Sequence, residues 1–132
     1  MTTFADVHRA IDEYTVSALA GENVVYSNQD DNALSQGTAP YVKQRVLFTQ
    51  ARQFELGAPE RGRNYGVVVF LIHVRRGQGE AARNTLLQKV VNSFRSRVIG
   101  AATLLNARMT TQGENANWSL TGVEVPFYYH DL

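Results

Sequence analysis

The stretch Asn64–Arg75 constrains the fold most, because it contains an unbroken apolar run from Val67 to Ile72. The run is far shorter than the ~20 apolar residues that cross a membrane. Its β-branched and aromatic side chains favour a strand. Successive strand side chains point to opposite faces, and both faces of this stretch are apolar over most of its length. The sequence therefore predicts a central strand that is covered on both sides.

Length and composition indicate one globular domain that spans residues 1–132. The chain has 132 residues, of which 44% are hydrophobic and 19% are charged. A formal net charge of +1 gives no argument for nucleic-acid or anionic-membrane binding. The absence of cysteine excludes disulfides and thiolate chemistry. No basic segment followed by an apolar one marks a secretory signal, so we expect the protein to act in the cytoplasm where it is made.

Two stretches have the spacing of amphipathic helices that pack on a sheet. In Phe4–Ala20, apolar residues recur every three or four positions, Thr3 is a candidate N-cap and Gly21 a candidate stop. In Glu80–Val98, the apolar side chains form one stripe, the first residue places negative charge in the first turn, and Gly100 ends the helix.

Four further segments read as strands, and hairpin connections dominate between them. Pro126 lacks an N–H for a sheet ladder, so we expect it at an edge strand or at a strand's exit. The fold class that follows is α+β, with a mainly antiparallel sheet of four to five strands packed with two helices. The four further strands are Val24–Tyr26, Tyr41–Phe54, Ala102–Thr111 and Trp118–Tyr129.

The turn before the second helix formally matches a dinucleotide fingerprint. Gly77, Gly79 and Ala82 give the spacing G-x-G-x-x-A, between a strand and a helix. The βαβαβ arrangement that accompanies this fingerprint is absent from the predicted element order, and no Walker lysine motif occurs. We therefore interpret the segment as a flexible strand-to-helix turn.

No other motif assembles a catalytic or metal site. His8, His73 and His130 are far apart and lack zinc-ligand spacing, and no G-x-S-x-G nucleophile motif occurs. Asp30 and Asp31 lie in a long polar loop, where carboxylates are solvated or contact a basic partner. We expect no enzymatic activity, no cofactor and no metal.

Basic residues near the two ends of the central strand are further candidates. They suit phosphate contacts, which need positive charge but no motif, and they equally suit ordinary solvated charge. The candidate partner or subunit contacts are Asp30, Asp31, Arg61, Arg63, Arg75 and Arg76.

In length and element order, the chain resembles the tail terminator and related minor tail proteins of long-tailed bacteriophages. The resemblance consists of the first helix, the short strand after it, the polar loop closing on Ala39–Val42, the hairpin around Gly57–Asn64, the second helix and the closing strand. It implies a tail-terminator-like fold and a non-enzymatic virion protein. Such proteins form a ring, usually of six copies, on the head-proximal end of the tail tube.

The resemblance also implies the partners. They are further copies of the chain, the tail tube protein and a head-closure or neck protein, with DNA passing through the ring without specific binding and no membrane contact. The protein would be assembled in the host cytoplasm and would end in the virion, where its ring stops tube polymerisation.

Three alternatives stay open from the sequence. The first is another neck protein, which would meet the portal side rather than the tube. The second is a small ligand-binding or enzymatic α+β domain with a pocket at His73, Tyr65 or the turn Gly77–Gly79. The third is a nucleic-acid-binding module.

Overall fold

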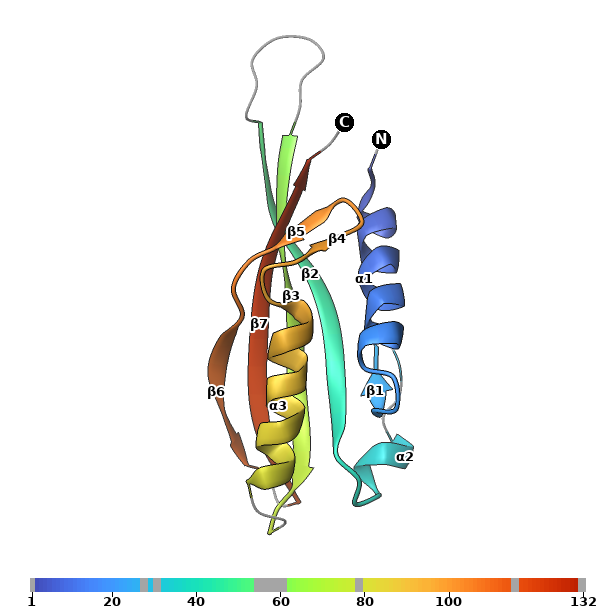
Figure 1. Cartoon of the computed structure of the whole chain (residues 1–132), viewed down its shortest axis with the longest axis vertical. Helices are drawn as coiled ribbons and strands as arrows, with labels where there is room; N and C mark the ends of the chain where they lie inside the picture. Colours follow the sequence, from blue (N-terminus) through green and yellow to red (C-terminus); the bar gives the residue numbers. More distant parts are fainter. Residues whose placement is uncertain are drawn as a thin grey trace.

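In the part of the chain that the structure describes, seven strands form one sheet, and the two long helices pack on the same face of it (Figure 1). The computed structural model describes residues 2–26, 29, 32–53, 62–77, 80–114 and 117–130. In chain order, the elements are α1 (Phe4–Ala18), β1 (Val24–Val25), α2 (Asn32–Ser35), β2 (Tyr41–Gln53), β3 (Gly62–Arg75), α3 (Ala81–Phe94), β4 (Val98–Ile99), β5 (Ala102–Leu104), β6 (Arg108–Glu114) and β7 (Trp118–His130).

The fold class α+β is confirmed, but the sheet is mixed and larger than the four to five strands expected. Its order is β1-β2-β3-β7-β5-β4, with β6 also paired to β7. The pair β1–β2 is parallel and the other pairs are antiparallel. The segment expected as one strand over Ala102–Thr111 is two strands, since Leu104 pairs with Phe127 whereas Arg108 pairs with Glu124.

Strand β3 is central, as predicted, and Figure 1 shows it running along the molecule between β2 and β7. The side chains of Val68, Phe70 and Ile72 are fully buried against the helices. The prediction that the other face is covered too is wrong for the described residues. Both long helices lie on one side, and Val69 on the other side is only half-buried.

The core forms where the inward stripe of each helix meets this sheet face. Val7 and Ile11 of α1 and Val90 and Phe94 of α3 are at most 1% exposed. The Phe70 and Phe94 rings lie 4.6 Å apart. Burial of side chains of this size contributes about 1.5–3 kcal/mol each, so this layer dominates the stability of the domain.

The helix boundaries follow local chemistry. Thr3 caps α1 as predicted: its side chain accepts a hydrogen bond from the Asp6 N–H, and the Asp6 carboxylate accepts one from the Thr3 N–H. Helix α3 ends earlier than the sequence indicated, because Ser96 adopts a left-handed φ of +51° that the helix cannot continue through. Val98, at the end of the range predicted for this helix, is instead 72% exposed in β4.

Pro126 was expected at an edge or an exit, yet it lies inside β7, a central strand. Its carbonyl accepts a hydrogen bond from the Leu105 N–H, 2.8 Å away, and so points away from β3. The N and C=O of a strand residue point to the same side, so the missing donor faces the segment between β5 and β6. A ladder bond is therefore not lost at this position.

No helix in the described ranges is long and apolar enough to cross a membrane.

Candidate functional site

The sheet face turned away from α1 and α3 is the most extensive candidate site; we call it the open face. The strand register places on it every second residue of β2, β3, β6 and β7. Its centre is apolar, and the side chains there are half-buried except that of Leu47, which is 38% exposed. The central apolar residues are Leu47, Val67, Val69, Leu71, Leu120 and Pro126.

One end of the open face is closed by an aromatic cluster. The His73 ring stacks on Tyr41, with centroids 4.2 Å apart and planes 13° apart, and Trp118 meets Tyr41 edge-on at 5.1 Å. The His73 Nδ1 lies 3.1 Å from the Leu71 carbonyl oxygen. Leu34 of α2 packs on this cluster. His73 is thus a packed residue at the covered end of the face, and it lines none of the described pockets.

The opposite end combines aromatic and basic groups. The Arg63 Nε donates a hydrogen bond to the His130 Nε2 at 3.0 Å, and the same guanidinium lies 4.8 Å from the centroid of the Tyr128 ring. Tyr65 pairs with Tyr128 across the strands. Because the Arg63 guanidinium contacts both His130 and Tyr128, it is held close to the sheet.

Charges on the open face are mostly positive. A single cross-strand row contains Arg45, Val69, Glu124 and Arg108 in that order. Arg108 forms an ion pair with Glu124 at 3.1 Å. In the described residues, Glu124 is the one acid of this face. The basic residues of this face whose side chains the structure describes are Lys43, Arg45, Arg63, Arg75 and Arg108.

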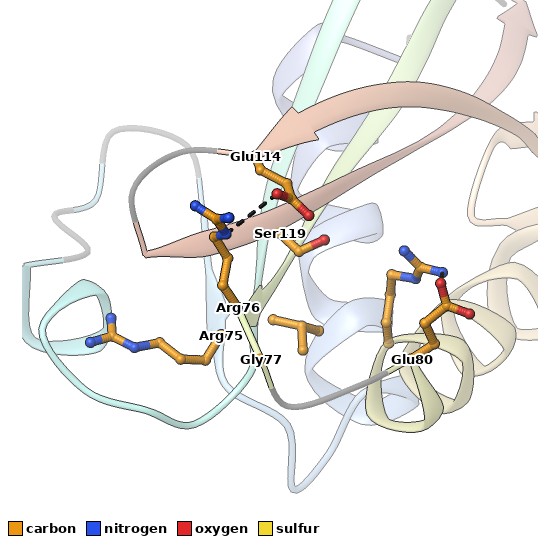
Figure 2. Close-up of a pocket in the computed structure, with 8 residues that line it drawn as sticks. Arg75, Arg76, Gly77, Glu80, Glu114 and Ser119 are labelled. Carbon is orange, nitrogen blue, oxygen red and sulfur yellow. Dashed lines mark ion pairs between the residues drawn. The ribbon is translucent and has the colours of Figure 1, made fainter.

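A second candidate is a pocket of about 450 Å³ between the end of β3 and the start of α3 (Figure 2). Arg76 forms an ion pair with Glu114 at 3.3 Å, and Arg83 forms one with Glu80 at 3.3 Å. Figure 2 shows Arg76 turned toward Glu114, whereas Arg75 points away. Four of the five charged residues that line the pocket are therefore neutralised in pairs, and Ser119 is the hydroxyl that lines it.

The residues singled out from the sequence do not form one site. Arg63 and Arg75 share the open face but sit at opposite ends of β3, about 40 Å apart at strand spacing. Arg76 lies in the pocket instead. Asp30, Asp31 and Arg61 lie outside the described residues.

The glycine motif is placed only in part. Gly77 has a left-handed φ of +86°, as a strand-to-helix turn requires, whereas Gly79 lies outside the described residues. No group of three or more His, Asp or Glu among the described residues is arranged to hold a metal.

Sequence reasoning missed Lys43, Arg45 and Arg108 as site residues. The sequence alone could have indicated Lys43 and Arg45. Val42 and Val46 are apolar and mark the buried face of β2, so the alternating residues Lys43 and Arg45 lie on the other face. Arg108 had no such signal, since its place depends on the pairing of β6 with β7.

No family model and no curated protein matches this sequence. Among solved structures, 16 chains match. One of them, named only by an identifier that states no function, has a TM-score of 0.70 at 10% identity, over 98% of this chain and 96% of that chain. This similarity shows a shared fold, and the fold is all that it shows.

Proposed function

We propose that this chain is a structural subunit of a bacteriophage tail, a tail terminator whose copies close into a ring of about six on the head-proximal end of the tail tube. The observation that carries the proposal is the open face. An apolar strip of this kind in the middle of a sheet is suited to a protein contact.

The composition of the open face supports a subunit or partner contact. Protein interfaces combine an apolar centre with a polar rim, and Tyr, Trp and Arg are enriched in them. Val69 and Leu71 lie at the centre of the face, with Arg45 and Arg108 flanking them across the sheet. Tyr65 and Tyr128 provide aromatic groups toward one end.

The described pocket favours a structural role over an enzymatic one. A hydrolytic or transfer site needs a nucleophile with a neighbouring base, or a base poised against substrate. Arg76, Arg83, Glu80 and Glu114 form ion pairs with one another instead. Ser119 donates to no His, Asp or Glu in the described hydrogen bonds.

The similarity in length and element order to tail terminators supplies the specific role. That role includes the tail tube and a neck protein as partners, DNA passing through the ring, and a place in the virion. A neighbouring neck protein is the second candidate, because the same open face would serve a ring that meets the portal side. The two differ in partner and not in the interface between copies.

A tube-assembly experiment tests the proposal. Tail tube protein from the same phage is polymerised with and without the purified chain, and tubes are measured in negative-stain images. The proposal predicts short tubes with a ring at one end. Tubes of unchanged length that carry no ring would overturn the terminator role. A ring that binds portal-side proteins and ignores tubes would favour the neck protein.

A further inference from the structure

The open face is basic, whereas the segment from α1 to Glu22 is acidic. Among the residues whose side chains the structure describes, the open face holds five basic residues and one acid. On the other side, the segment from α1 to Glu22 holds four acids, Asp6, Asp12, Glu13 and Glu22, against the single base Arg9. Helix α3 and its flanking residues carry Arg83, Lys89, Arg95 and Arg97 against Glu80, so the acidity of the helix side is confined to α1 and the turn after it.

The outer stripe of α1 combines this acidity with small or apolar side chains. Four exposed residues recur at helical spacing on this stripe: Ala5, Arg9, Glu13 and Val16. They lie opposite the buried stripe of α1, which includes Val7. Val16 is 62% exposed. The stripe thus combines two small or apolar side chains with one base and one acid, and no described element covers it.

Charge decides between the two ways in which copies could meet. Two open faces packed on each other would place basic residues against basic residues, which costs several kcal/mol in an interface. An open face packed on the outer stripe of the next α1 brings opposite charges together. That second contact joins different surfaces, and such heterologous contacts are the ones that generate rings.

Helix α1 is long enough to cover the apolar strip. It has 15 residues and is about 22 Å long at helical rise. The apolar strip from Val67 to Leu71 is about 13 Å long at strand rise.

We propose that the outer stripe of α1 of one copy docks on the open face of the next, with Glu13 near Arg45. This inference rests on the proposed ring and names the surfaces that join its subunits. Neither Arg45 nor Glu13 forms an ion pair with the residues that the structure describes, so both are available for a contact between copies.

A charge-swap experiment tests the docking on the full chain. Assembly of wild type, Arg45→Glu, Glu13→Arg and the double variant is followed by sedimentation velocity at low and high salt, alone and with tail tubes. We expect each single reversal to weaken assembly by about tenfold or more, and the double variant to recover most of it. Arg97→Glu, an exposed reversal of equal charge outside both surfaces, should assemble like wild type.

Each outcome bears on one of the two proposals. Assembly that withstands both single reversals, or a double variant no better than the singles, would overturn the docking but leave the ring. A wild-type chain that never assembles, even with tubes, would remove the ring and the docking together. Salt-dependent binding of a single-stranded oligonucleotide that Arg45→Glu abolishes, with assembly intact, would show the open face to be a nucleic-acid surface and overturn the docking.

Discussion

Gly66 and Phe127 lie so close across β3 and β7 that a β-carbon on Gly66 would be 2.4 Å from the Phe127 ring. The same β-carbon would be 2.5 Å from the Leu47 carbonyl oxygen. The register of β2 shifts between Phe48 and Gln50, next to this glycine. The missing side chain therefore lets the Phe127 ring and the irregular part of β2 fill one layer of the core.

Gly66→Ala is expected to destabilise the fold by about 1–3 kcal/mol or more, because the ring and the β2 backbone must both move. Chemical denaturation gives this loss directly. Gly113→Ala is the matched control, since a β-carbon there meets no atom within 4 Å. Equal stability of the two variants would contradict the tight packing described for Gly66.

A buried hydrogen-bond chain joins α1 to β2. The Thr15 Oγ1 lies 2.6 Å from the Gln44 Oε1 and 2.8 Å from the Ile11 carbonyl, and the Gln44 Nε2 donates to the Asp12 Oδ1 at 2.8 Å. Thr15→Val keeps the shape but removes a donor from the buried Gln44 oxygen, so we expect a loss of about 1–3 kcal/mol. Adding Gln44→Leu should recover part of this loss. A double variant that loses the full sum of the two single changes would argue against coupling between these side chains.

Two carboxylates in α1 should give opposite pH dependences. Hydrogen bonds with the Thr3 backbone and side chain lower the pKa of Asp6, so its contribution to stability is present above the unfolded-state pKa and is lost as pH falls. Burial raises the pKa of Asp12, and His8 and Gln44 oppose that rise only partly. The stability linked to Asp12 is therefore present at low pH and lost as pH rises through its folded-state pKa.

Thermal unfolding of Asp6→Asn and Asp12→Asn checks both signs. Near pH 7, Asp6→Asn should unfold at a lower temperature than wild type, and Asp12→Asn at an equal or higher one. Both differences should shrink at about pH 2, where the wild-type carboxylates are protonated. The same sign of change in both variants would show that the Asp12 hydrogen bonds outweigh its burial.

Adjacent residues of β3 should respond differently to substitution, because they point to opposite faces. Phe70→Ala removes a ring that is fully buried, and should cost about 3–5 kcal/mol of folding stability. Leu71→Lys places charge on the half-buried open face, so it should leave the folded monomer almost intact but prevent assembly. Denaturation and sedimentation measured on both variants separate the two effects. A Leu71→Lys protein that assembles normally would remove the open face from the interface.

The sequence predicted those parts of the fold that short-range patterns determine. Helical spacing and a capping residue located α1, and the apolar run located β3 and its central place in the sheet. The end of α3 was misplaced, because the left-handed Ser96 has no signature that distinguishes it from a helical serine. The apolar run also predicted that both faces of β3 are covered. In the described residues of one copy, the helices cover only one of these faces.

The arrangement of the site could be predicted less well, because it depends on pairing between distant strands. The division of residues 102–111 between β5 and β6 follows from the register of β7, which no local pattern contains. That register brings Arg108 beside Glu124 and adds Arg108 to the basic residues of the open face. By contrast, the alternation of side chains along β2 is enough to place Lys43 and Arg45 on the open face.

The most direct test of the account is the mass of the purified protein, measured by light scattering across concentration and in the presence of tail tubes, with images of the heaviest species. The account predicts closed rings of about six copies, formed in solution or upon tube contact. A protein that stays a 14.7 kDa monomer under every one of these conditions, tubes included, would contradict it.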